Sequence, residues 1–185
     1  MAVKSDSWII QMAKENGMIE PFAESQIRKG ISYGVSSYGY DFRIDDKFKV
    51  FIGNDQGVMD PKAQEHNQFQ DFTGDICEIP PNSYVLGQTI EYFRIPRDVI
   101  TTCFGKSTYA RCGIFLHVTP FEPEWEGHAT IAISNSTRFP ARVYAGEGIG
   151  QLLFHGVDEI CATSYADKKG KYQAQKSITI AKGCG

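Results

Sequence analysis

The sequence predicts an all-β sandwich or barrel that begins with one short helix. After Gly30 the chain consists of short segments in which apolar and polar residues alternate, as in "VITTCFG" and "HATIAISNST". Gly, Pro, Asn and Asp separate these segments, and no strand–helix–strand rhythm is present, which argues against a doubly wound nucleotide fold. With 185 residues and 42% apolar content the chain can bury one core, so we expect a single domain over residues 1–185.

The expected helix lies at the N-terminus. Residues 5–7 can cap it, Trp8, Ile9 and Met12 recur at helical spacing, and Gly17 ends it.

The expected strands come after the helix, and two polar segments accompany them. The strands are "YGYDFRI", "FKVFIG", "SYVLGQTIEYFRIP", "VITTCFG", "GIFLHVTP", "HATIAISNST" and "ARVYAGEGIGQLLF". Residues 54–75 are expected to form a long polar loop with some order of its own. Residues 160–185, rich in Lys, Gln and Gly, are expected to form an arm that closes over a ligand.

Charge and composition exclude several classes of function. The formal net charge is -3 and the basic residues are scattered, so a nucleic-acid polymer is not expected as a partner. No signal peptide or long apolar run is present, which predicts a cytoplasmic protein without a membrane segment. The five cysteines form no C-x-x-C pair, so we expect mostly buried, reduced thiols and no zinc.

The segment "CFGKSTYARCG" has the chemistry of a phosphate-binding turn. Gly105 frees backbone N–H groups, and the next three residues, Lys106, Ser107 and Thr108, add a cation and two hydroxyl groups. Arg111 adds a cation that stays charged. The segment is not a Walker A loop, because the first glycine of that motif is missing.

Other segments carry weaker signals. His117 is expected to be a core histidine, and Asp41 and Arg43 a structural ion pair. Phe121 and Trp125 offer apolar surface to a base or sugar. The neighbouring acidic residues could face a metal-bound triphosphate or form an exposed acidic turn; they are Glu122, Glu124 and Glu126.

The strand "EGHATIAISNST" has one apolar face and one small, polar face. Thr130, Ala132 and Ser134 lie on the polar face, which is typical of a strand that lines water or a ligand. A methyl group in its middle can neither donate a hydrogen bond nor accept a proton.

The ordered set of segments "GKSTYARCG", "HVTPFEPEWEGH", "SNST", "GIGQLLF" and "SYADKKGKYQAQ" resembles the dCTP deaminases of the dUTPase superfamily. The resemblance covers most of the chain, from about Ser5 to Gln175. It implies a distorted β-barrel or jelly roll, assembled as a homotrimer, that converts dCTP and water to dUTP and ammonia. It also implies Mg²⁺ bound with the triphosphate and no metal held by the protein. The zinc deaminase signature, H-x-E followed by P-C-x-x-C, is absent.

The resemblance also implies site residues by position. Ser107 and Arg111 match positions that act closest to the ring, and the remaining matches are nucleotide contacts: Lys106, Thr108, Tyr109, Ala110, Thr130, Ile131, Gln151, Tyr165, Lys171 and Gln175.

Ala132 occupies the position of the family's general-base glutamate, five residues beyond Gly127. A general base contributes roughly a hundred- to ten-thousand-fold to a rate, so we expect nucleotide binding with little or no deamination. Because the other matched positions are intact, replacement of a glutamate is favoured over natural loss of activity. The alternatives are a non-catalytic regulator that binds dCTP or dTTP, and a bifunctional deaminase that also acts as a dUTPase.

Overall fold

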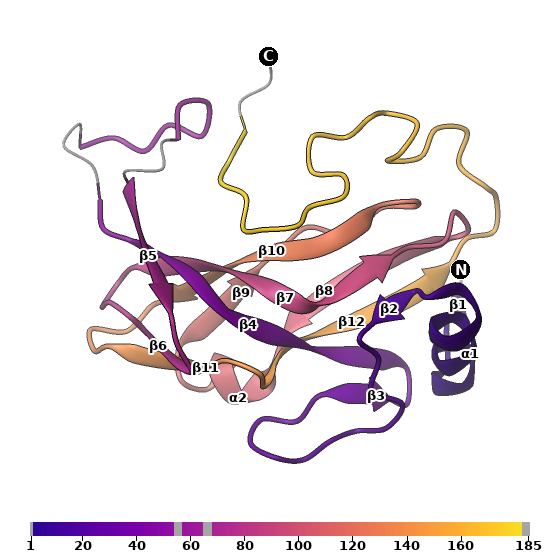
Figure 1. The fold of residues 1–185 in the computed structure, drawn as a ribbon, viewed down its shortest axis with the longest axis horizontal. Helices are drawn as coiled ribbons and strands as arrows, with labels where there is room; N and C mark the ends of the chain where they lie inside the picture. The colour runs from indigo at the N-terminus through magenta and orange to yellow at the C-terminus, as the bar shows by residue number, and fades with distance from the viewer. Residues whose placement is uncertain (1, 54–56, 65–67, 183–185) are drawn as a thin grey trace.

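The computed structural model describes residues 2–53, 57–64 and 68–182 as a curled, mainly β half-barrel (Figure 1). The elements in chain order are β1 (Ala2–Val3), α1 (Asp6–Asn16), β2 (Ile19–Glu20), β3 (Gly34–Ser36), β4 (Gly39–Phe51), β5 (Phe69–Thr73), β6 (Ile76–Ile79), β7 (Tyr84–Arg94), β8 (Val99–Gly105), α2 (Ser107–Ala110), β9 (Ile114–His117), β10 (Glu126–Asn135), β11 (Ala141–Tyr144) and β12 (Gly148–Gly156). The prediction of a mainly β, barrel-like fold with a short N-terminal helix is confirmed.

Helix α1 begins and ends where its sequence signals predict. Ser5 is the N-cap residue, and Gly17 ends the helix in the left-handed conformation, with a φ of 61°. A glycine adopts this conformation without the steric cost of a Cβ atom. Ile9 and Ala13 are the buried positions of the helix, so its apolar side packs on the sheet.

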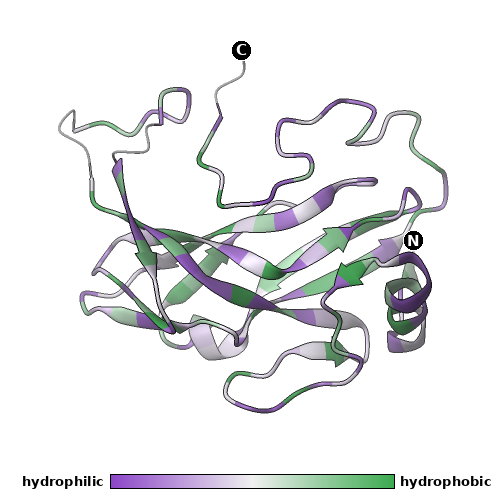
Figure 2. Cartoon of the chain, in the orientation of Figure 1, coloured by the Kyte–Doolittle hydropathy of each residue, from purple (hydrophilic) through white to green (hydrophobic). Residues whose placement is uncertain are grey.

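The strands form one large sheet with the order β1-β12-β4-β7-β10-β9 and a small sheet of β11 and β6. Strand β4 curves the large sheet, because its first half pairs with β12 and its second half with β5 and β7. The apolar stripes of the strands meet inside the curve (Figure 2). Ile131 and Ile133 of β10 are both fully buried there, as the alternation predicts.

Three local expectations were wrong. Residues 54–75 were expected to be a loop with some order of its own, but β5 is a regular strand within this range and pairs with β4, so long-range pairing overrides the polar composition. Residues 54–56 and 65–67 of this range lie outside the described residues. "YGYDFRI" and "FKVFIG" belong to the single strand β4. Of the described cysteines only Cys77 is buried, and all four are free; Cys184 lies outside the described residues.

Among the described residues no helix is long and apolar enough to cross a membrane.

Candidate active site

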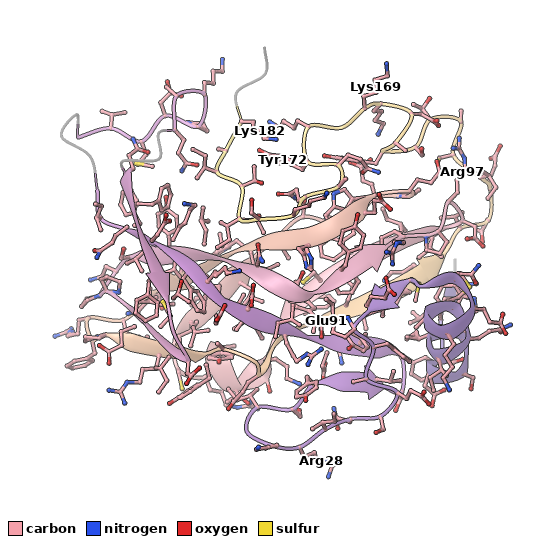
Figure 3. All side chains as sticks on the ribbon, in the orientation of Figure 1. Arg28, Glu91, Arg97, Lys169, Tyr172 and Lys182 are labelled. Atoms are coloured by element: carbon pink, nitrogen blue, oxygen red, sulfur yellow. The ribbon has the colours of Figure 1, made fainter. Side chains whose placement is uncertain are left out.

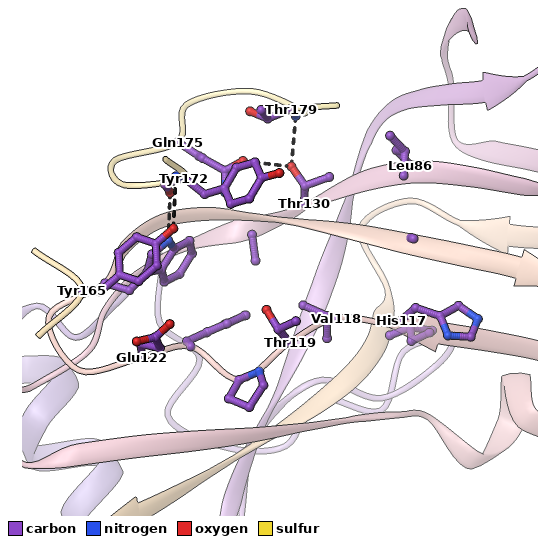
Figure 4. Close-up of a pocket in the computed structure, with 16 residues that line it drawn as sticks. Leu86, His117, Val118, Thr119, Glu122, Thr130, Tyr165, Tyr172, Gln175 and Thr179 are labelled. Carbon is purple, nitrogen blue, oxygen red and sulfur yellow. Dashed lines mark hydrogen bonds between the residues drawn. The ribbon is translucent and has the colours of Figure 1, made fainter. Parts of the chain in front are cut away.

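A cavity of about 640 Å³ opens between the polar face of β10 and the chain after β12 (Figure 4). Thr130 and Ala132 form part of its wall, together with His117 at the end of β9 and Leu86 of β7. Antiparallel pairing sets this wall: Ala132 lies opposite His117 on one side and opposite Leu86 on the other. Directly opposed residues project to the same face of a sheet, so these side chains meet around Ala132. The small, polar face predicted for this strand therefore lines a cavity.

The segment after Glu159, which we call the arm (residues 160–182), lies over this cavity (Figure 1). It adds to the start of β10 through backbone hydrogen bonds: Ala174 N donates to Glu126 O at 2.9 Å, and His128 N donates to Gln175 O at 3.0 Å. Gly127 allows this close approach, because a Cβ atom there would lie 2.8 Å from Gln175 N.

The arm also binds the cavity wall directly. The Thr130 hydroxyl donates to Gln175 Oε1 at 3.2 Å and accepts from Thr179 N at 3.1 Å. Trp125 Nε1 donates to Tyr172 O at 2.9 Å, and Tyr172 N donates to the Tyr165 hydroxyl at 3.1 Å. The arm therefore contributes four residues to the cavity lining: Tyr165, Tyr172, Gln175 and Thr179.

Ion pairs hold the first part of the arm, around Asp167 and Lys168, against the rest of the protein. Arg97, labelled in Figure 3, donates to Glu124 at 2.6 Å and to Asp167 at 2.9 Å. Lys168 pairs with Glu122 at 3.0 Å. A hydrogen bond from Ser164 N, followed by the bond from Arg97, holds the pKa of Asp167 below its ordinary value. Of the acidic residues near Trp125, Glu122 thus binds the arm directly, and Glu124 is linked to it through Arg97.

Further along the arm, Lys171 is not among the described residues that line the cavity. Its Nζ donates to Lys182 O at 2.7 Å, and Lys182 Nζ donates to Lys171 O at 3.0 Å. The ammonium groups of Lys171 and Lys182 lie 5.1 and 5.8 Å from the centroid of the Tyr172 ring; Figure 3 labels Lys182 and Tyr172.

A second polar cluster lies around Asp41, which is 2% exposed. Lys106 Nζ donates to Asp41 Oδ2 at 2.6 Å, and Gln151 Nε2 donates to Asp41 Oδ1 at 3.0 Å. The expected Asp41–Arg43 pair was wrong, because Arg43 binds Glu91 at 2.8 Å instead. Two of the residues matched as nucleotide contacts therefore share one buried carboxylate.

The phosphate turn lies apart from the cavity within one chain. The described cavity lining includes no residue of 106–111. In Figure 1, α2 lies on the opposite side of the sheet from the arm. Arg111 is exposed and donates to Ser107 O at 3.1 Å. Thr108 is exposed as well, and Ala110 N donates to Lys106 O within the turn.

Two matched residues have buried side chains, so only their backbones can contact a ligand. Ile131 is in the core, and Tyr109 is 3% exposed with its hydroxyl accepting from Tyr144 N. Burial raises the pKa of Tyr109 to about 12.

His117 differs from its sequence-based expectation. Its side chain is exposed in the cavity wall, and its Nε2 lies 2.8 Å from Ser134 Oγ. The expectation failed because β9 is an edge strand of four residues and His117 is its last residue. The strict alternation of "EGHATIAISNST" indicated the cavity face, but nothing in "FLHVTP" indicated that His117 opens onto it.

The described residues contain no group of three or more His, Cys, Asp or Glu side chains that could hold a metal ion.

Comparison with known proteins places the chain in a family. Residues 3–157 match the family model for dCTP deaminase-like proteins. The chain is 56% identical to the dCTP deaminase of Methylococcus capsulatus and 57% identical to that of Paraburkholderia phymatum, in both cases over 98% of this chain and 100% of the relative.

Among solved structures, the chain is similar to the 2'-deoxycytidine 5'-triphosphate deaminase from Agrobacterium tumefaciens. The TM-score is 0.63 at 17% identity over 82% of this chain and 47% of that chain, so this likeness supports the fold. On the sequence matches, the chain belongs to the dCTP deaminase family.

Proposed function

We propose that this chain binds dCTP in the β10 cavity and that Ala132 has disabled the deamination of the bound nucleotide to dUTP. The observation that carries this proposal is the placement of Ala132. Its methyl group lies in the cavity wall between Leu86 and His117, at the position of the expected general base. Family membership supports the reaction, and the missing carboxylate is the reason for proposing that the chain is inactive.

The reaction requires a group that moves protons between water and the pyrimidine. A carboxylate at position 132 would take a proton from water as its oxygen attacks C4, and would later protonate the departing amine. Glu122 is the carboxylate among the described lining residues, and it is paired with Lys168. In Figure 4 it lies at the opposite end of the cavity from His117. It does not replace a base at position 132.

Binding of the nucleotide is proposed to use two subunits of a homotrimer. The phosphate turn and the cavity of one chain lie on different sides of the sheet. A neighbouring copy would bring its Ser107 and Arg111 to this cavity and complete it. The arm would then close over the base with Tyr165 and Gln175, while Lys171 would leave Lys182 to reach the phosphates.

Mg²⁺ is proposed to enter with the triphosphate, whose oxygen atoms are the ligands it prefers. Lys106, Ser107 and Thr108 would bind the phosphate oxygens that the cation leaves free, and Mg²⁺ would offset the remaining negative charge.

A second candidate function is regulation by dCTP or dTTP binding without chemistry. Two observations favour it. The cavity wall has a methyl group where a general base is expected, at Ala132. The residues proposed to bind nucleotide, Lys106 and Gln151, still keep their hydrogen bonds to Asp41.

Ammonia release from dCTP and Mg²⁺, measured for this chain and for Ala132→Glu, separates the two functions. We expect Ala132→Glu to raise turnover by about a hundred- to ten-thousand-fold with little change in dCTP affinity. Pyrophosphate measured in the same samples would reveal a dUTPase activity. If both proteins bind dCTP and release no ammonia, the regulator is the correct function.

A further inference from the structure

The environment of Ala132 has one apolar side and one side with hydrogen-bonding groups. On the apolar side, Ala132 packs against the cluster of Phe69, Leu86 and Ile180. On the polar side, the His117 imidazole and the Ser134 hydroxyl lie 2.8 Å apart. When His117 Nε2–H donates to Ser134 Oγ, the Ser134 hydroxyl is free to donate a hydrogen bond to an anion.

Two cavities meet the wall at this position. The 640 Å³ cavity and a second cavity of about 520 Å³ are both lined by Ala132 and His117. The second cavity includes three serines among its lining residues: Ser83, Ser134 and Ser136. A small solute can therefore approach Ala132 from a side that the arm does not cover.

From this geometry we propose that the cavity wall at Ala132 is a binding site for a small free carboxylate such as formate, which replaces the missing general base. The inference rests on the proposed function, because its readout is deamination of dCTP. Truncated side chains in packed surroundings leave space that small molecules can occupy. Formate fits the chemistry of the site, since one oxygen can accept from the Ser134 hydroxyl, which His117 orients, while the other faces the nucleotide.

The apolar side makes the bound carboxylate a better base. Burial beside Leu86 and Ile180 disfavours the charged form and so raises the pKa of the carboxyl group. The cavity's lining carboxylate, Glu122, lies at the far end and is paired with Lys168, so it does not repel an anion at Ala132 (Figure 4).

The proposed step conserves atoms and protons. Formate takes a proton from water as the water oxygen forms its bond to C4, and passes that proton to N3 of the ring. It then takes the remaining hydroxyl proton as C4=O forms and gives it to the amino group, which leaves as ammonia when the C4–N bond breaks. Formate is regenerated, so it acts as a catalyst and is not consumed.

The test is ammonia release from dCTP and Mg²⁺ by this chain at rising formate concentration, with chloride at matched ionic strength as the control. We expect a saturable increase of about tenfold or more. It should be less than the full effect of a built-in base, because a free anion must be captured from solution. Formate should not increase the turnover of Ala132→Glu, which already has a carboxylate there.

Two further variants establish where formate acts. Ala132→Leu fills the space with apolar atoms, and we expect it to bind dCTP yet show no formate response. His117→Asn removes the imidazole, and we expect the half-saturating formate concentration to rise several-fold.

The inference is overturned if formate has no effect on this chain while Ala132→Glu is active, or if Ala132→Leu responds as strongly as the parent. An inactive Ala132→Glu that binds dCTP would refute the proposed function itself, so the two failures are distinguishable.

Discussion

The wall around Ala132 and the cluster around Asp41 differ in how their polar groups are used. Around Asp41, a buried carboxylate binds Lys106, Gln151 and Gln26. At Ala132, the strand presents a methyl group beside a histidine and a serine that bind each other. The comparison shows that two residues proposed to bind nucleotide, Lys106 and Gln151, are held in place by hydrogen bonds. At position 132, which is proposed to transfer protons, the side chain is a methyl group that cannot titrate.

The largest expected effect concerns the stability of the Asp41 cluster. Asp41→Asn leaves Lys106 without its charged partner in a site where both side chains are largely buried, at 2% and 14% exposed. Breaking a buried pair costs about 3–5 kcal/mol of the free energy of unfolding. Urea unfolding at fixed protein concentration measures it.

The control for this prediction is Glu78→Gln, which breaks the exposed pair with Arg142. We expect a loss below about 1 kcal/mol there. Equal losses in the two variants would show that the Asp41 cluster has no special structural role.

The next effect concerns nucleotide affinity. Arg111→Ala removes an exposed guanidinium whose described hydrogen bond is to Ser107 O, so the fold should remain intact. Loss of a charge-assisted hydrogen bond of about 1.5–3 kcal/mol weakens binding by about ten- to a hundredfold. Calorimetric titration with dCTP measures this, and Arg142→Ala is the matched control. Unchanged affinity would remove Arg111 from the proposed site.

A smaller effect concerns the arm. Arg97→Ala removes the bonds to Glu124 and Asp167 that hold the base of the arm. Because both bonds are partly exposed, we expect only a several-fold faster tryptic cleavage within residues 168–176, with the body of the protein protected. Lys14→Ala, which replaces a residue of α1 and breaks its exposed pair with Glu24, should leave this rate unchanged.

The smallest effect is the pH dependence of the same contact. The folded-state pKa of Asp167 is lowered, so its contribution is present above the ordinary carboxylate pKa and is lost as the pH falls through the lowered value. Amide exchange of Ser164, whose N–H binds Asp167, should therefore stay protected at pH 5 and lose protection only below about pH 4. In Asp167→Asn this pH dependence should disappear.

Much of the fold could be predicted from the sequence because it depends on local patterns. The alternation in β10 and the caps of α1 are properties of neighbouring residues, and both predictions were confirmed. Strand β5 was missed because its pairing with β4, and not its own composition, makes it a strand.

The site was only partly predictable, because its contacts join distant residues. Asp41 lies 65 residues from Lys106 and 110 from Gln151 in the chain, so no local pattern reveals that they meet. The exposure of His117 follows from its place at the end of an edge strand. Position 132 was identified by resemblance to a family. The cavity beside it could not be predicted from the sequence, because residues of the folded arm form part of its lining.

The most direct test of the central claim compares Ala132→Glu with Ala132→Gln in a single turnover of saturating dCTP with Mg²⁺. Both side chains have nearly the same size, but only the glutamate can accept a proton. The account predicts that both variants bind dCTP like the parent. It also predicts that the rate of ammonia release is about a hundredfold or more higher in Ala132→Glu than in Ala132→Gln. Equal rates in the two variants would contradict the claim that position 132 lacks a general base.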